Sequence, residues 1–140
     1  MSGAPIAVVG LAAILPGSGD VAGFWENIRE ARDCFSDVPA SHWKIEDYFD
    51  PTPRAKDKTY GRRGGFITPQ PFDALSFGLM PSSLASTDAA QLLALLVSQR
   101  CIADADHGPT PRFDRSRCSV ILGAAAATQL VAHMSGRMAQ

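Results

Sequence analysis

Two short apolar runs constrain most strongly what this chain can fold into. The first covers Ile6 to Gly10 and the second Cys118 to Gly123, and both are uninterrupted and contain β-branched residues. Such runs are typical of strands covered on both faces, as in a mostly parallel sheet. Between them, residues 84–105 are apolar around nearly the whole circumference of a helix, which predicts a buried helix. The pattern predicts a layered α/β fold.

The same pattern indicates that the fold is incomplete. Two strands alone cannot protect the edges of a sheet or bury both faces of a central helix. Residues 1–140 show no internal repeat and no clear domain boundary. We therefore expect an N-terminal portion of a larger α/β domain, which is poorly soluble or partly unfolded when purified alone.

The segments between the two runs predict another helix and a long connector. Asp20 lies where a helix N-cap belongs. The apolar positions that follow at helical spacing are Val21, Phe24, Trp25 and Ile28. The polar positions, Asn27 among them, fall on the other side of this helix. Residues 33–83 contain many prolines and aromatics, so we expect a loop that packs through its own side chains, with a short strand around Gly65 to Ile67.

The C-terminal residues predict a last helix. It would begin in the alanine run 124–127 and continue through Leu130, Val131 and Met134.

Composition and charge exclude several classes of protein. Hydrophobic residues make up 46% and charged residues 19%, which is typical of a globular chain. A net charge of −1 provides no general attraction for nucleic acid or anionic lipid. No basic segment leads into an apolar one at the N-terminus, and no run reaches the ~20 apolar residues of a membrane span. We expect a cytoplasmic protein that contacts neither nucleic acid nor membrane.

The cysteines and histidines show no catalytic or metal-binding pattern. Cys34, Cys101 and Cys118 are widely spaced, and none is placed at a helix N-terminus, where a thiol is activated. We expect all three to be buried as small apolar side chains in a reducing compartment. The histidines are His42, His107 and His133, without metal-ligand spacing. His42, next to Trp43 in the sequence, is expected to have a structural packing role, and His107 to be a solvated residue at a helix end.

Two glycine-containing motifs have a simple structural interpretation. Gly17 to Ala22 matches G-x-G-x-x-A, but it does not follow the strand directly, and Asp20 would oppose a pyrophosphate. We interpret it as a connector with a capped helix. Arg62 and Arg63 precede two glycines, and we expect them to pair with carboxylates such as Asp57 or Asp73 rather than to bind RNA.

A series of short motifs occurs in a characteristic order. They are Ile6-Ala7-Val8-Val9-Gly10 with Leu15-Pro16-Gly17, Phe24-Trp25-Glu26-Asn27-Ile28, Asp33 to Pro39 with Trp43, Tyr48-Phe49-Asp50, Lys58-Thr59-Tyr60, Arg63-Gly64-Gly65-Phe66, Phe72-Asp73 and Phe77-Gly78. Residues 5–137 thereby resemble the N-terminal part of a ketosynthase (β-ketoacyl synthase) domain of a type I polyketide or polyunsaturated fatty acid synthase. Thr87 to Leu93 reads T-D-x-x-Q-L-L, which is more like the polyunsaturated fatty acid branch.

The resemblance implies a thiolase-like α-β-α-β-α fold and a homodimer of the full-length form. It also implies a decarboxylative Claisen condensation. In this reaction a cysteine accepts an acyl group from the phosphopantetheine thioester of an acyl carrier protein, and two histidines assist decarboxylation of the malonyl-carrier. In the family that cysteine lies in a D-x-A-C-S-S-like elbow, downstream of the strand that resembles Cys118 to Gly123. No segment here matches the elbow. We therefore assign no catalytic, cofactor-binding or metal-binding residue to residues 1–140.

Three functions follow as hypotheses. The first is the N-terminal part of a ketosynthase, an acyltransferase whose full-length form condenses acyl and malonyl thioesters, while this chain alone is inactive. The second is a non-catalytic scaffold or dimerisation fragment that complements a separate catalytic chain. The third is a dinucleotide-binding oxidoreductase, for which we expect titration to show no cofactor binding.

Overall fold

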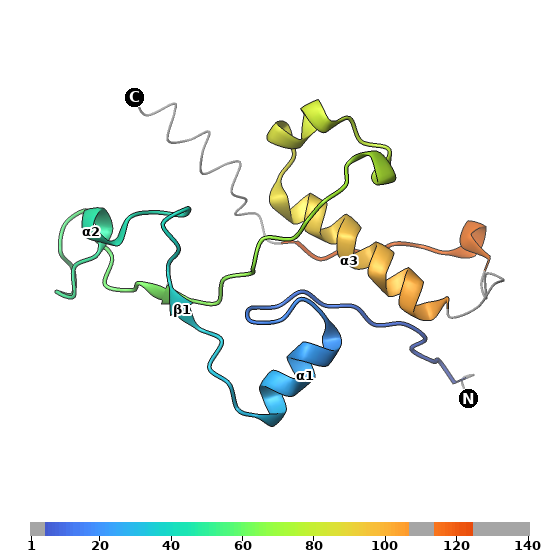
Figure 1. Ribbon diagram of the computed structural model, residues 1–140, viewed down its shortest axis with the longest axis horizontal. Coiled ribbons are helices and arrows are strands. Elements are labelled where there is room, and N and C mark those ends of the chain that lie inside the picture. Colours follow the sequence, from blue (N-terminus) through green and yellow to red (C-terminus); the bar gives the residue numbers. More distant parts are fainter. Residues whose placement is uncertain (1–4, 107–113, 125–140) are drawn as a thin grey trace. The chain divides into compact units, whose positions relative to one another are not determined.

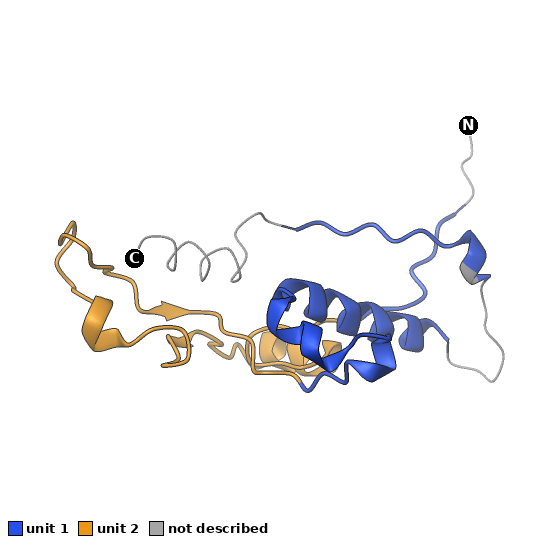
Figure 2. Ribbon diagram, turned by 90° about the horizontal axis from the view of Figure 1, so that it is seen from above, with its two compact units in different colours: residues 1–12, 71–140 blue, residues 13–70 orange. Residues whose placement is uncertain are grey.

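The computed structural model describes residues 5–106 and 114–124, which belong to two compact units (Figure 2). Unit 1 consists of Met1–Ala12 and Pro71–Gln140, and unit 2 of Ala13–Gln70. Each unit contains helices of its own, and the paired strands belong to unit 2. Figure 1 labels these elements along the chain.

Unit 1 is organised around the helix α3 (Ala89–Ala105). Two 3-10 helices precede it, η1 (Leu75–Phe77) and η2 (Pro81–Ser86), and a third, η3 (Arg115–Arg117), follows. The sequence predicts one helix from residue 84, but the α-helix starts five residues later. Thr87 and Asp88 are extended, and the Asp88 carboxylate accepts a hydrogen bond of 2.8 Å from the Ala90 amide. This N-cap separates η2 from α3.

The α3 helix is less buried than its composition predicts. Among its described side chains, Leu96 alone is buried, whereas Leu95 and Ile102 are exposed. Apolar side chains become buried only where another element covers them. The expectation of a fully buried helix is therefore wrong for the part of the chain that the structure describes.

The two apolar runs are extended but do not form paired strands. In the described residues, neither Ile6 to Gly10 nor Cys118 to Gly123 belongs to a sheet, and Ile6 and Ile121 are 98% and 93% exposed. The predicted strands are wrong in this respect, because a strand exists only through hydrogen bonds to a partner. The last helix predicted from residue 124 lies, from residue 125 on, outside the described residues.

The first apolar run is nevertheless anchored to α3. The Leu11 amide donates a hydrogen bond of 2.8 Å to the Asp104 carboxylate, and the Cys101 thiol donates to the Gly10 carbonyl at 3.4 Å. These bonds join positions more than ninety residues apart at the C-terminal end of α3. The helix ends at Ala105, where the sequence predicts its end.

Unit 2 begins with the helix α1 (Val21–Arg29), which confirms the predicted amphipathic helix. The Asp20 carboxylate accepts a hydrogen bond of 2.7 Å from the Gly23 amide, so Asp20 is the N-cap that the sequence predicts. The chain enters this helix through a tight turn, in which Leu15 and Ser18 exchange two backbone hydrogen bonds of 2.9 Å.

The rest of unit 2 is a long connector with one small antiparallel sheet. Strand β1 (Ser36–Asp37) pairs with β2 (Arg63–Gly64), with Ser36 opposite Gly64, and the short helix α2 (Ile45–Tyr48) lies between them in sequence. The strand that the sequence predicts around residues 65–67 is observed slightly earlier, at Arg63–Gly64. Ring contacts confirm packing through aromatics, since Trp43 meets Tyr48 edge to face with 6.1 Å between ring centroids.

Candidate functional site

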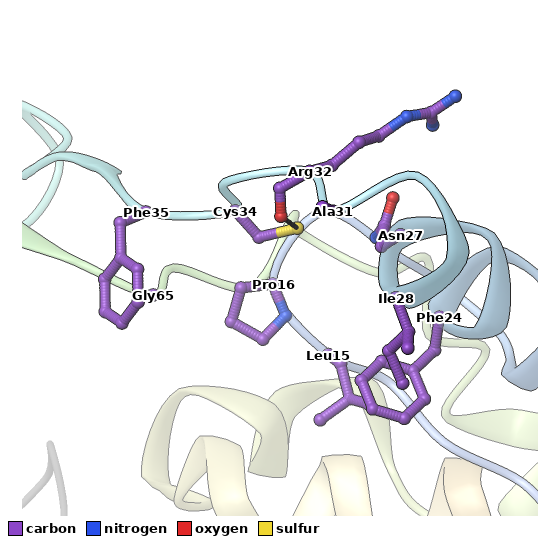
Figure 3. Close-up of a pocket in the computed structure, with 10 residues that line it drawn as sticks. All are labelled: Leu15, Pro16, Phe24, Asn27, Ile28, Ala31, Arg32, Cys34, Phe35 and Gly65. Carbon is purple, nitrogen blue, oxygen red and sulfur yellow. Dashed lines mark hydrogen bonds between the residues drawn. The ribbon is translucent and has the colours of Figure 1, made fainter.

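Unit 2 contains a cavity of about 430 Å³ next to α1 (Figure 3). Its lining is mostly apolar. The lining residues are Leu15, Pro16, Phe24, Asn27, Ile28, Ala31, Arg32, Cys34, Phe35 and Gly65. The side chain of Arg32 points away from the cavity, so its main chain rather than its charge faces the lining (Figure 3). A volume of this size falls within the range of about 300–1,000 Å³ that is typical of ligand pockets.

Two glycines allow a close approach of the chain segments that line this cavity. Gly17 has a left-handed φ of 72°, and a β-carbon there would lie 2.8 Å from the Cys34 sulfur. A β-carbon on Gly65 would lie 2.8 Å from Cγ of Pro16. Larger residues at these positions would therefore need the surrounding chain to move.

Asn27 is the buried residue of α1, with 7% of its surface exposed. Its side-chain amide donates a hydrogen bond of 3.2 Å to the Gly17 carbonyl. The sequence places Asn27 on the polar side of the helix, which predicts exposure, and this is wrong. The burial has a physical basis, because the hydrogen bond compensates for the lost contact with water. Asn27 follows Gly17 by ten residues in the sequence, and this short separation is the sequence signal that could have indicated a local contact.

The three cysteines occupy different environments. Cys34 lines the cavity half-buried, and its thiol donates to the Arg32 carbonyl at 3.8 Å. Cys101 is also half-buried, whereas Cys118 is exposed, so the prediction of burial is wrong for Cys118. None of the residues that line the cavity is a histidine or a carboxylate, so the lining offers Cys34 no side-chain base.

His42 has the packing role that the sequence predicts. Its imidazole meets Phe66 edge to face, with 5.2 Å between centroids, and Nδ1 lies 3.5 Å from the Ser41 hydroxyl. His107 and His133 lie outside the described residues. Within residues 5–106 and 114–124, no group of three or more His, Cys, Asp or Glu side chains could hold a metal ion.

Arg62 and Arg63 pair with carboxylates, but not with the predicted Asp57 or Asp73. Arg63 donates bonds of 2.9 Å to both the Asp33 carboxylate and the Phe35 carbonyl. The hydrogen bond from the Phe35 amide, and next the Arg63 guanidinium, hold the pKa of Asp33 below its ordinary value.

Arg62 makes a parallel set of contacts from the neighbouring position. Its Nε lies 3.5 Å from Asp37, and its guanidinium lies 5.2 Å from the centre of the Phe49 ring. The pairing of β1 with β2 brings Asp37 close to Arg62 and Asp33 close to Arg63. The spacing of these residues in the sequence does not reveal this proximity.

The glycine motif at residues 17–22 forms a capped connector. Ser18 is used in the turn with Leu15, and the Asp20 carboxylate binds a free amide at the start of α1. This geometry agrees with the structural interpretation of the motif. Within the part of the chain that the structure describes, no helix has the length and hydropathy needed to cross a membrane.

Residues 3–139 match the family described as Beta-ketoacyl synthase, N-terminal domain. One polyunsaturated fatty acid synthase protein of a Thraustochytrium species is 44% identical over 100 residues, covering 71% of this chain. The polyketide synthase ThaG of Burkholderia thailandensis is 40% identical over 103 residues, covering 73% of this chain. The chain spans only 4% and 2% of these relatives.

Solved structures show the same relationship in three dimensions. The oxazolomycin ketosynthase domain of Streptomyces albus matches 69% of this chain with a TM-score of 0.66 and 32% identity. The PfaC ketosynthase–chain length factor matches 70% with a TM-score of 0.62 and 32% identity. The chain covers 17% and 11% of these structures. These similarities confirm the thiolase-like α/β fold class, of which the chain forms an N-terminal portion.

Proposed function

Because this chain belongs to the family of β-ketoacyl synthase N-terminal domains, we propose that it forms the first part of a condensing ketosynthase. The complete enzyme would join acyl and malonyl thioesters by decarboxylative Claisen condensation in polyketide or polyunsaturated fatty acid synthesis. The match over residues 3–139 carries this proposal. The proposed partners are the acyl carrier protein and a second copy of the ketosynthase.

Within such an enzyme, this chain would provide scaffold rather than reacting groups. Condensation needs an activated thiolate and donors directed at a developing oxyanion. The sequence has no D-x-A-C-S-S-like elbow, and the cavity lining places no base beside Cys34. The reacting cysteine and histidines would therefore come from ketosynthase residues that this chain does not cover.

A ketosynthase chimera tests the proposal. In it, this chain replaces the matching N-terminal residues of the oxazolomycin ketosynthase domain, and the product formed from acyl-enzyme and malonyl-carrier is followed by mass spectrometry. We expect a β-ketoacyl product, and none after the recipient's nucleophilic cysteine is replaced by alanine. A folded chimera that accepts the acyl group but forms no product would contradict the proposal.

The exposed extended segments favour a second arrangement, in which this chain complements a separate catalytic chain. In the described residues Ile6 to Gly10 and Cys118 to Gly123 belong to no sheet, so another strand would be able to pair with them. Mixing this chain with the remainder of the recipient ketosynthase distinguishes the arrangements. Recovery of condensation only in the covalent chimera would exclude complementation.

A further inference from the structure

A loop of unit 2, residues 50–59, presents exposed cations and is called here the basic loop. We propose that the basic loop docks the acyl carrier protein by binding carboxylates on the carrier's surface. The side chains that bind these carboxylates are those of Arg54 and Lys56. This inference rests on the proposed function, because that function supplies the carrier as a partner.

The two ends of the basic loop are held together by backbone hydrogen bonds. The Asp50 amide donates to the Thr59 carbonyl at 3.0 Å, and the Thr59 amide donates to the Tyr48 carbonyl at 2.8 Å. Phe49 and Thr59 thereby form an isolated parallel bridge. A compact surface loop of about 6–16 residues whose ends lie close together is an Ω-loop, a class of loop that is frequently functional.

Hydrogen bonds inside the basic loop fix its conformation. The Thr52 amide donates to the Asp50 carboxylate at 2.8 Å, and the Ala55 amide donates to the Thr52 carbonyl at 3.3 Å. Arg54 and Asp57 have left-handed φ angles of 68° and 57°, which residues other than glycine keep only where the surrounding structure holds them. The loop therefore presents its side chains in a preformed arrangement, which lowers the entropic cost of binding.

Two cations of the basic loop have no partner among the described residues. Arg54 and Lys56 are exposed, and neither side chain forms an ion pair or a hydrogen bond there. Lys58 differs from them, because its ammonium group donates a hydrogen bond of 2.6 Å to a main-chain carbonyl of α2. Residues 54–58 contain three cations and one carboxylate, that of Asp57, so this stretch attracts anionic groups.

The composition of the basic loop keeps it at the surface of a complete ketosynthase. Arginine and lysine are almost never fully buried unless they are paired, because covering an unpaired cation costs its hydration. Pro51 and Pro53 have no amide hydrogen to donate, which disfavours pairing of this segment with a strand. The remaining part of the domain is therefore a poor partner for Arg54 and Lys56.

A carrier protein is the partner that fits these cations. In the proposed function the carrier binds and leaves in every cycle, and opposite charges at an exposed surface accelerate association. Nucleic acid and anionic membranes are bound through many cations at once, whereas this loop offers two unpaired ones in a chain of net charge −1. The carboxylates are therefore assigned to a protein surface.

Kinetics of the ketosynthase chimera test this docking. Its acyl-enzyme form is mixed with malonyl-carrier, or with malonyl-pantetheine, which has the same thioester without the carrier protein. We expect the double variant Arg54→Glu, Lys56→Glu to raise the KM for malonyl-carrier about ten-fold, because attraction becomes repulsion. The KM for malonyl-pantetheine and both kcat values should stay unchanged.

Two control variants separate docking from a general effect of charge. Lys56→Arg keeps the cation and should retain the parent KM for malonyl-carrier. Arg117→Glu makes the same charge reversal at an exposed position of unit 1 and should leave that KM unchanged. The proposal would be overturned by an unchanged KM in the double variant, by an equal rise with malonyl-pantetheine, or by an equal rise in Arg117→Glu.

Direct binding keeps the two proposals distinct. Product formation with the same KM in parent and double variant would reject the docking loop and retain the function. Absence of product from both malonyl thioesters would reject the function. Fluorescence anisotropy of a labelled carrier then tests the docking loop alone, with about ten-fold weaker binding to the double variant expected and equal binding overturning it.

Discussion

A β-carbon on Gly10 would lie 2.5 Å from the main-chain carbonyl oxygen of Cys101, closer than real β-carbons come. It would also lie 2.8 Å from the β-carbon of Ala105. Hydrogen bonds from Leu11 and Cys101 hold the two segments at this distance. The first apolar run can therefore pack on α3 only with glycine at position 10.

Gly10→Ala is expected to destabilise unit 1. The new methyl group would meet backbone atoms that cannot rotate away, and overpacking of this kind costs about 1–3 kcal/mol. The urea midpoint of the ketosynthase chimera should fall. Gly123→Ala is the matched control, because a β-carbon there meets nothing within 4 Å. Equal midpoints for both variants would contradict the close contact.

Asn27→Ala is expected to destabilise unit 2. The substitution removes the hydrogen bond to Gly17 and leaves its carbonyl without that donor, at a cost of about 1–3 kcal/mol. Amide hydrogen exchange across residues 17–29 should accelerate. Glu26→Ala, at the neighbouring exposed position, should change exchange little.

Asp20→Ala is expected to shorten α1 at its N-terminus. The Gly23 amide would lose its acceptor, and losing an N-cap costs about 0.5–2 kcal/mol. Hydrogen exchange of the first-turn amides should accelerate, while Asp20→Ser, which can still cap, should retain most of their protection. Similar exchange in both variants would show that the carboxylate does not hold the helix start.

Arg63→Gln is expected to raise the pKa of Asp33 toward its ordinary value, because a guanidinium that favours the carboxylate is lost. Because the pKa of Asp33 is lower in the folded than in the unfolded state, its carboxylate stabilises the fold at pH values above the unfolded-state pKa of about 3.9. This contribution is lost as the pH falls through the lower folded-state pKa. NMR titration of labelled aspartate measures the shift. Arg62→Gln, which removes the partner of Asp37, should leave the titration of Asp33 unchanged.

This chain alone is expected to bind an apolar dye and to melt without a sharp transition. Ile6 and Ile121 are almost fully exposed, and the buried apolar residues of the described chain are only Val38, Ala74 and Leu96. Fluorescence of 8-anilinonaphthalene-1-sulfonate and thermal circular dichroism test this. A cooperative melt of a monomer would show that the chain completes its own core.

The sequence alone was sufficient for the features that depend on neighbours along the chain. Asp20 caps α1 because its carboxylate reaches an amide three residues later. The order of the short motifs also indicated the family, because a family pattern resides in the residues themselves.

Only the tertiary structure decided which distant groups meet. Arg63 binds Asp33 rather than Asp73, Asn27 is buried while Trp25 is exposed, and the run from Ile6 to Gly10 packs on α3 without joining a sheet. Burial, ion pairing and strand formation each require a partner brought from elsewhere by the fold. A local sequence pattern indicates which kind of partner a side chain or strand requires, and the tertiary structure determines whether that partner is present.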